Sequence, residues 1–335
     1  MQSEVLEGVV AVNGVVPTRQ QTLELVVLQR EVLADDVVGL VLGAPTGETL
    51  PPWNPGAHID LMLTDELVRQ YSLCSSPADT QHWRVAVLLE PDSRGGSRHV
   101  HAAVDQGSRI RAAGPRNHFP LRPSSRYQFI AGGIGITPII PMIEQAEADG
   151  AEWQLLYGGR RNSSMAFLDE LAKYGDRVHI WPQDERGLLE LDSVLGDARD
   201  DTLVYCCGPE RLLTAVEAAV EHWPTSALHV ERFSARPGAV AASEHGLDTF
   251  QVVCRQSGVT VDIGPGESIL DALREKGISM LSSCMEGICG TCETPVVEGV
   301  PDHRDSVLSA EEKAENDCMM ICVSRSQSPT LVLEV

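Results

Sequence analysis

Residues 283–292 read SCMEGICGTC, and this stretch decides how the C-terminal part of the chain folds. Its three thiols, Cys284, Cys289 and Cys292, have the spacing C-x4-C-x2-C, and Cys322 follows 30 residues later. Four thiolates, two for each iron, are the ligand set of a [2Fe–2S] cluster, and this spacing is the plant-type one. We therefore expect these four cysteines to hold such a cluster.

Two glycines inside the same stretch agree with this interpretation. Gly287 and Gly290 let the backbone wrap closely around a cluster and direct N–H groups toward the sulfur atoms, which helps to set the redox potential. Two alternatives stay open at this point. The thiols could form a zinc site, although zinc knuckles use two cysteine pairs and the fourth cysteine here has no such mate. Cys318 could replace Cys322 as the fourth ligand.

The composition places this stretch in a large and acidic chain. The chain has 335 residues, with 26 Lys and Arg against 48 Asp and Glu, so its net charge is −22. This length predicts two or three domains. A hydrophobic content of 43% is enough for real cores and excludes global disorder. The negative charge argues against binding to nucleic acid or to an anionic membrane, because it would be repelled by phosphates.

The N-terminus and the cysteines indicate the compartment. The first residues lack a basic region followed by an apolar core, and no apolar run approaches about 18 residues, so we expect neither a signal peptide nor a membrane span. Of the nine cysteines, five lie in the last 52 residues. We expect a cytoplasmic protein, in which clustered cysteines serve as metal ligands or catalytic groups rather than as disulfides.

Residues 21–122 are predicted to form a β-barrel or sandwich, because short alternating segments rich in Val and Leu are separated by Pro and Gly. On a strand of this region, Arg69 and Tyr71 share one face and Ser72 points the other way. An arginine beside a hydroxyl suits a phosphate, and a tyrosine can lie against a flat ring. The later turn RGGSRHVH could also cradle a phosphate.

From Arg126 onward, strand and helix patterns alternate, which predicts a parallel sheet with helices on its faces. AGGIGITP (131–138) follows a strand and opens a helix, and CCGPE (206–210) ends a later strand. Ligands bind at the carboxyl ends of strands in such sheets, so the two turns predict a nucleotide site. Residues 235–249 are small, polar and rich in turn formers, and predict a linker before the cysteine-containing part.

Taken in order, RQYSL, RGGSRHVH, GPRNHFPL, AGGIGITP, YCCGP, HVERF and the four-cysteine pattern resemble the reductase components of Rieske-type oxygenases. The nearest resemblance is to the phthalate dioxygenase reductase family, which includes the vanillate demethylase reductases. It covers about residues 20–335. It implies a multidomain chain with an antiparallel β-barrel flavin domain (1–122), an α/β parallel-sheet nucleotide domain of ferredoxin–NADP reductase type (123–235), a linker (236–248) and an α+β plant-type ferredoxin domain (249–335).

The resemblance also implies the cofactors and the residues that bind them. The flavin of that family is FMN, and we find no segment for the adenosine half of FAD between Gly96 and Arg111. NADH is expected as the electron donor, with NADPH as the alternative, because Arg160 and Arg161 could grip a 2′-phosphate. The matching flavin residues are Arg69, Tyr71, Ser72, Gly96, Ser97 and Phe233, and the matching nucleotide residues are Gly132, Gly133, Gly135, Pro138, Arg160, Gly208 and Pro209. Thr137 and Cys207 are expected to act in catalysis by orienting the nicotinamide.

These expectations combine into one electron chain, from NADH through FMN to the [2Fe–2S] cluster and on to a terminal oxygenase. A nicotinamide delivers two electrons at once and a cluster takes one, so a flavin is the necessary converter. The expected partner is a Rieske-type oxygenase that hydroxylates or O-demethylates aromatic compounds, with a cytochrome P450 as the alternative. An iron–sulfur redox sensor and a zinc-stabilised interaction protein are the remaining alternatives. We expect a monomer.

Overall fold

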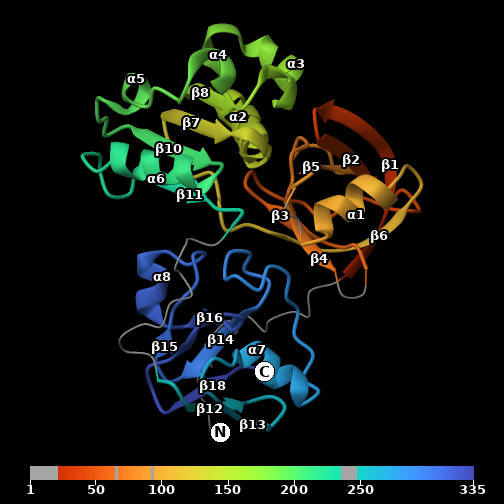
Figure 1. Ribbon diagram of the computed structural model, residues 1–335, viewed down its shortest axis with the longest axis vertical. Helices are drawn as coiled ribbons and strands as arrows, with labels where there is room; N and C mark the ends of the chain where they lie inside the picture. The colour runs from red at the N-terminus through yellow and green to blue at the C-terminus, as the bar shows by residue number, and fades with distance from the viewer. Residues whose placement is uncertain (1–21, 65–66, 92–93, 235–246) are drawn as a thin grey trace, which may run out of the picture.

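The computed structural model describes residues 22–64, 67–91, 94–234 and 247–335. These residues form three units, each built on its own sheet, which are coloured red to orange, yellow to green, and cyan to blue in Figure 1. Most of the predicted linker at 236–248 lies outside the described residues. No helix in the described part of the chain is long and apolar enough to span a membrane.

The first unit is an antiparallel sheet of six strands in the order β4-β3-β6-β1-β2-β5. The sheet curls into a barrel, because the Cys74 N–H, just after the end strand β4, donates to the Arg84 carbonyl of the other end strand β5 at 2.8 Å. Its apolar residues alternate toward the barrel interior, as the sequence pattern predicts. The elements are β1 Thr22–Ala34, β2 Val37–Gly43, β3 His58–Met62, β4 Val68–Ser72, β5 His82–Leu88, α1 Gly96–Ala103 and β6 Arg109–Arg116.

The second unit is a parallel sheet in the order β11-β10-β7-β8-β9, with helices on its faces. The strands that follow β7 are added on one side as β8 and β9 and then on the other side as β10 and β11. The boundary between β7 and β10 is therefore the switch point where such sheets bind ligands. The strands are β7 Arg126–Gly132, β8 Glu152–Gly159, β9 Val178–Pro182, β10 Thr202–Cys207 and β11 Leu228–Glu231. The α-helices are α2 Ile136–Ala148, α3 Leu168–Leu171, α4 Gln183–Arg186, α5 Asp192–Leu195 and α6 Glu210–Ala219, and the 3-10 helices are η1 Gly133–Gly135, η2 Asn162–Ser164 and η3 Ala172–Arg177.

One predicted helix of this unit is shorter than its sequence pattern indicates. The pattern AFLDELAKYG predicts a helix up to Gly175, but α3 ends at Leu171 and a 3-10 helix follows. Gly175 has a φ of 58°, in the left-handed region, and interrupts the regular backbone of that 3-10 helix; nothing in the structure explains why the α-helix already ends at Leu171.

The third unit is a mixed sheet in the order β13-β12-β18-β14-β16, in which only β12 and β18 run parallel, with a separate β15-β17 pair. Ser268 starts α7 by accepting a hydrogen bond from the Asp271 N–H at 3.0 Å. Cys322 lies in the turn after β16 rather than within a strand. The elements are β12 Phe250–Cys254, β13 Thr260–Ile263, α7 Ile269–Glu275, β14 Glu293–Glu298, β15 Pro301–Asp302, α8 Ala310–Glu315, β16 Cys318–Met320, β17 Arg325–Ser326 and β18 Thr330–Leu333.

The buried Arg325 holds the start of the third unit together. Its guanidinium donates to the carbonyls of Glu267 at 2.6 Å, Asp248 at 2.8 Å and Gly264 at 3.0 Å. Arg325→Met should lower the free energy of unfolding of this unit by about 3 kcal/mol, because the carbonyls lose their buried donor. Calorimetric unfolding of the full chain measures this loss.

Arg255→Met is the matched control for that experiment. Arg255 is 62% exposed at its side chain and forms one ion pair with Glu334 at 3.4 Å. An exposed pair contributes little, so this variant should change the unfolding free energy by less than about 1 kcal/mol. Equal losses in the two variants would contradict the role given to Arg325.

Candidate functional site

The four predicted cluster ligands meet at one side of the third unit. The thiol of Cys284 lies within hydrogen-bond reach of the thiols of Cys289 and Cys322, and the thiol of Cys292 lies within reach of Cys322. Among the described residues, no three His, Cys, Asp or Glu side chains are grouped as a single metal ion would need. Four thiols that contact one another in this way are the ligand set that a two-iron cluster would use. Cys318 lies apart from them, beside the acidic Asp317.

The backbone around these sulfurs has the features of a cluster loop, which we define as residues 283–292. The N–H groups of Glu286 and Ile288 donate to the Cys284 sulfur at 3.3 and 3.5 Å. Gly287 and Gly290 have φ values of 67° and 69°, in the left-handed region. A Cβ at Gly287 would lie 2.5 Å from the Val323 side chain. The loop can therefore take this course only with glycine there.

The predicted flavin residues lie on β4 and at the start of α1. A Cβ at Gly96 would lie 2.4 Å from the Arg69 side chain, so the glycine lets the arginine cross the end of the helix. The Arg69 guanidinium donates to the Arg94 carbonyl at 2.7 Å. An arginine beside a helix N-terminus suits the phosphate of FMN. Tyr71 packs against the barrel core, and burial raises the pKa of its hydroxyl, which keeps it uncharged.

The two predicted nucleotide turns meet at the switch point of the second unit. A Cβ at Gly135 would lie 2.3 Å from the Cys207 carbonyl oxygen, and a Cβ at Gly208 would lie 3.0 Å from the backbone of Gly132. These three glycines therefore serve the close approach of one turn to the other. Gly133 differs, because its φ is 54° and nothing lies within 4 Å of a Cβ there. Its backbone is the part of this turn that a ligand can approach.

The two predicted catalytic residues are both buried. Thr137 is 3% exposed, and its hydroxyl donates to the Ile134 carbonyl at 3.0 Å. Cys207 is 0% exposed, and burial raises the pKa of its thiol well above the usual range. The thiol therefore stays protonated and is unsuited to nucleophilic attack. This agrees with an orienting role.

Glu231 is a functional candidate that the sequence reasoning did not single out. It is the last residue of β11, and its carboxylate accepts from the Ser72 hydroxyl at 3.5 Å and lies 3.9 Å from the Cys207 sulfur. It thereby joins the flavin strand β4 to the nucleotide strand β10. Burial raises the pKa of its carboxyl to about 8. The segment HVERF contains it, but one glutamate at a strand end gives no local signal for this contact.

Two other predicted residues stand outside this group. Arg160 is exposed at the end of β8, and Phe233 is 43% exposed just after β11. Arg232, between Glu231 and Phe233, is turned into the second unit, where it pairs with Glu210 at 3.1 Å and Glu217 at 2.6 Å. The structure therefore brings Ser72 and Cys207 together but not Arg160 and Phe233.

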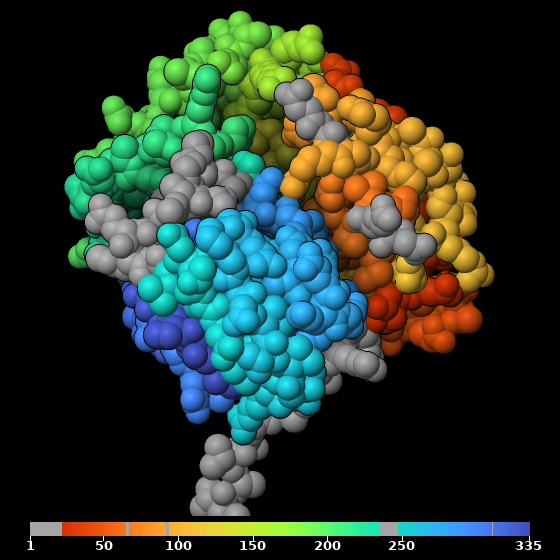
Figure 2. Space-filling model, turned by 60° about the horizontal axis from the view of Figure 1, so that its bottom comes forward, coloured from red at the N-terminus to blue at the C-terminus, as the bar shows by residue number. Residues whose placement is uncertain are grey.

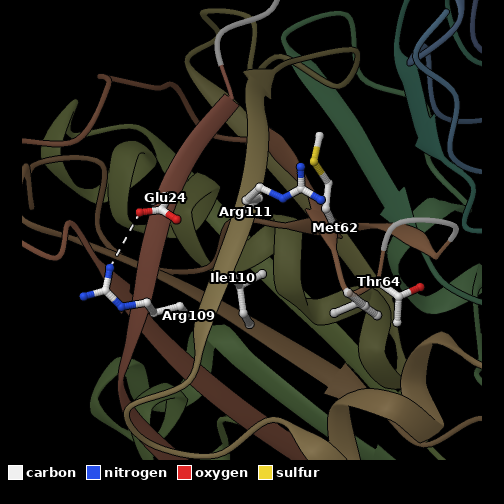
Figure 3. A pocket seen from close by; sticks show the side chains of 7 residues that line it. Glu24, Met62, Thr64, Arg109, Ile110 and Arg111 are labelled. Atoms are coloured by element: carbon white, nitrogen blue, oxygen red, sulfur yellow. Dashed lines mark ion pairs between the residues drawn. The ribbon is translucent and has the colours of Figure 1, made fainter. Parts of the chain in front are cut away.

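A shallow cavity of about 390 Å³ lies elsewhere, on the outside of the barrel (Figure 3). Its lining comes from β1, β3, β6 and the residues after β3, and includes the ion pair between Glu24 and Arg109 at 3.6 Å. None of the predicted flavin, nucleotide or cluster residues lines it. The chemistry is therefore assigned to the junction of the three units and not to this cavity.

Comparisons with known proteins give the same arrangement of parts. The family model described as an oxidoreductase NAD-binding domain matches residues 129–218, and the 2Fe-2S iron-sulfur cluster binding domain matches residues 252–327. The chain is 44% identical over 304 residues to phenoxybenzoate dioxygenase subunit beta of Ectopseudomonas oleovorans, covering 90% of this chain and 94% of that protein.

Two solved structures resemble the whole chain. One is phthalate dioxygenase reductase, described as a modular structure for electron transfer from pyridine nucleotides to [2Fe-2S]; it is 33% identical with a TM-score of 0.69, over 94% of this chain and 98% of that one. The other is an intact type IV self-sufficient cytochrome P450 monooxygenase, 44% identical with a TM-score of 0.87. That match covers 94% of this chain but only 41% of the monooxygenase.

The chain is an oxidoreductase of the modular flavin, nucleotide and iron–sulfur class. It belongs to the phthalate dioxygenase reductase family, as the sequence resemblance implies. The predicted multidomain fold is confirmed, and the predicted cofactors, FMN, NADH and a [2Fe–2S] cluster, are those of this family. The match of the cluster-binding model spans all four cysteines and decides against the zinc alternative.

The raised pKa of Glu231 predicts a pH dependence. Its carboxyl is neutral below about pH 8 and becomes a buried negative charge above it. We expect the reduction of the flavin by NADH to slow as the pH rises through about 8, because that charge opposes the arrival of electrons beside Ser72. Glu231→Gln should remove this inflection in stopped-flow measurements.

Stability provides a second measurement of the same group. Because the pKa in the folded state is above the ordinary value of 4.5, the folded protein binds more protons between pH 4.5 and about 8. The free energy of unfolding should therefore fall as the pH rises through this window, and less so in Glu231→Gln. A variant that keeps both the kinetic inflection and the slope would contradict the assignment.

Proposed function

We propose that this protein is the reductase component of an oxygenase system. It takes electrons from NADH and passes them through FMN and a [2Fe–2S] cluster to a terminal oxygenase. The FMN accepts two electrons together and releases them singly. A cytoplasmic location and a monomeric state, predicted from the sequence, remain part of the proposal.

The observation that carries this proposal is the place of β4 between the other two units. Ser72 of β4 donates to Glu231 of the nucleotide unit at 3.5 Å. Two residues earlier on the same strand, Gln70 donates to the Cys289 carbonyl of the cluster loop at 3.0 Å. One five-residue strand, which carries the flavin residues, therefore contacts both the donor site and the acceptor site.

The residues predicted from the sequence have distinct roles in this proposal. Arg69, Tyr71, Ser72, Gly96 and Ser97 would hold the FMN, and Phe233 would lie near its ring. The nucleotide turns 132–138 and 207–209 would receive the NADH, with Arg160 near its ribose. Within these turns, Thr137 and Cys207 keep the backbone in place for the nicotinamide. Cys284, Cys289, Cys292 and Cys322 would hold the cluster.

A cytochrome P450 is the second candidate partner, and one observation favours it. The self-sufficient P450 monooxygenase matches this chain with a TM-score of 0.87, above the 0.69 of phthalate dioxygenase reductase. Relatives named as dioxygenase or demethylase components favour the Rieske-type partner. Reconstitution with one purified oxygenase of each kind, with product formation as the readout, decides between the two.

The core of the proposal is tested on the anaerobically purified protein. We expect one FMN and one [2Fe–2S] cluster per chain, measured by flavin extraction, iron analysis and absorbance, and steady NADH-dependent reduction of cytochrome c. We also expect a higher kcat/KM for NADH than for NADPH. A protein with flavin and cluster but without NADH turnover would support the redox-sensor alternative. A preference for NADPH would overturn the choice of donor alone.

The charge of the C-terminal unit predicts how the partner docks. Residues 249–335 carry 6 basic and 14 acidic side chains, a net charge of 6 − 14 = −8. We propose that this unit docks on a basic face of the oxygenase. Electron transfer to the oxygenase should then weaken as ionic strength rises from about 0.05 to 0.5 M, because added salt screens the attraction.

The reduction of the flavin by NADH, measured in the same buffers without the oxygenase, is the control. It reports any effect of salt on the reductase itself. If electron transfer to the oxygenase is as insensitive to salt as the control, the charge of this unit has no part in docking.

A further inference from the structure

We propose that Asp60, Arg116 and Thr291 form a lock that fixes the cluster loop against the flavin unit and adjusts the electronic environment of the cluster. The inference rests on the proposed function and deepens it, because the lock positions the cluster for the electron that the flavin releases. Asp60 lies on β3 and Arg116 at the end of β6, whereas Thr291 lies in the cluster loop.

The three side chains are in direct contact. The Arg116 guanidinium donates to the Asp60 carboxylate at 2.6 Å and to the Thr291 hydroxyl oxygen at 3.0 Å. The Thr291 hydroxyl lies 3.2 and 3.3 Å from the two carboxylate oxygens of Asp60. Asp60 is 1% exposed and Thr291 is 7% exposed. Thr291 of the third unit thus covers the Asp60–Arg116 ion pair of the barrel.

The same hydroxyl reaches a proposed cluster ligand. The Thr291 oxygen lies 3.1 Å from the Cys289 sulfur. A hydroxyl has one proton to donate, and Arg116 already donates to its oxygen, so that proton goes either to Asp60 or to the sulfur. Asp60 and Arg116 of the flavin unit thereby influence how often the Thr291 hydroxyl donates to the Cys289 sulfur. Hydrogen bonds to the sulfurs are one of the factors that set a cluster's potential.

The face of the β3–β4 pair that carries Asp60 also contacts the cluster loop through Gln70. Asp60 is directly opposite Gln70 in the β3–β4 ladder, so the two side chains share a face. Gln70 donates to the Cys289 carbonyl at 3.0 Å, and the Ser283 hydroxyl donates to the Val68 carbonyl at 3.3 Å. Arg69 and Tyr71 alternate with these residues and point the other way. The lock therefore shares its face of the sheet with Ser72, whereas Arg69 and Tyr71 start from the opposite face.

The close fit at the cluster loop explains why a small residue precedes Thr291. A Cβ at Gly290 would lie 2.1 Å from Nε2 of His118, in the segment that follows β6. His118 stacks on His58 of β3, with ring centroids 5.6 Å apart. The loop is therefore pressed against the barrel at this point. Figure 2 shows that the blue unit as a whole adjoins the orange one. Thr291 is held beside this contact by its hydrogen bonds to Arg116 and Asp60.

A second charged contact between the same two units, made by Arg94, is more exposed to solvent and therefore weaker. Arg94 donates to the Cys284 carbonyl at 2.7 Å and pairs with Glu286 at 3.0 Å. Its side chain is 51% exposed, so water screens this pair. The buried Asp60–Arg116 pair is the one whose geometry is fixed, because a buried ion pair without its partner is strongly unfavourable. No covalent bond changes in the lock. The Thr291 hydroxyl proton is donated either to Asp60 or to the Cys289 sulfur.

Thr291→Val tests the lock, because valine keeps the shape of threonine and removes the hydroxyl. We expect a lower midpoint potential of the cluster, altered cluster signals in electron paramagnetic resonance, and electron transfer from flavin to cluster slowed about tenfold or more. Thr291→Ser, which keeps a hydroxyl, should restore the potential. Asp60→Asn should slow the same step and make it depend on solvent viscosity, because the loop is no longer fixed.

Thr294→Val is the matched control. Thr294 is also a buried threonine two residues beyond a cluster ligand, but its hydroxyl donates to the Cys292 carbonyl within its own unit, at 3.2 Å. It should leave the potential and the flavin-to-cluster rate unchanged. If Thr291→Val behaves like Thr294→Val in potential, spectrum and rate, the lock does not exist.

Flavin content, cluster content and the rate of flavin reduction by NADH are measured in every variant. These separate the two proposals. A wild-type protein without flavin, cluster or NADH turnover contradicts the proposed function. A functional wild-type protein whose Thr291→Val variant retains its potential and rate contradicts only the lock. If Thr291→Val loses its cluster while Thr291→Ser keeps it, a slower flavin-to-cluster step in Asp60→Asn supports the lock, and an unchanged rate contradicts it.

Discussion

The alternation of side chains along a strand is the constraint on which the arrangement of the three units depends. Because neighbouring residues point to opposite faces, β4 places Arg69 and Tyr71 on one face and Gln70 and Ser72 on the opposite, outer face. The outer face contacts the cluster loop through Gln70 and the nucleotide unit through Ser72. A shift of one residue in the β3–β4 register would exchange these faces and separate the cofactor sites.

The junction is also notable for how its buried charge is distributed. Glu231 is buried without a cation among its hydrogen-bond partners, and its pKa rises, so it is neutral under ordinary conditions. Asp60 is more deeply buried, at 1% exposure, and burial raises the pKa of its carboxyl too, but Arg116 at 2.6 Å opposes that rise. The two acids thus differ in what offsets the cost of burial, because Glu231 stays protonated whereas Asp60 has a cation beside it. The neutral Glu231 suits a site that receives electrons, and the Asp60–Arg116 pair suits a fixed contact between units.

The sequence predicted the parts that depend on local patterns. Cysteine spacing identified the cluster loop, hydrophobic periodicity identified the barrel and the parallel sheet, and the turns after β7 and β10 stood out by their glycines. It did not predict contacts that depend on the assembled units. Thr291 meets Asp60 across 231 residues and Arg116 across 175, and Ser72 meets Glu231 across 159. A single polar residue forms no periodic pattern, so one sequence alone does not predict which distant residue it will contact. The helix predicted to end at Gly175 is a different case, because its second half takes a 3-10 rather than an α conformation.

The contact between Gly290 and His118 has a consequence for the modular character of this family. Since a Cβ at Gly290 would meet the His118 ring, the cluster-bearing unit is fitted to a barrel surface that carries a ring at this point. Chimeras that join this unit to the flavin unit of a relative would meet a steric demand before any electronic one. The steric fit at Gly290 therefore limits which flavin units can be combined with this cluster-bearing unit.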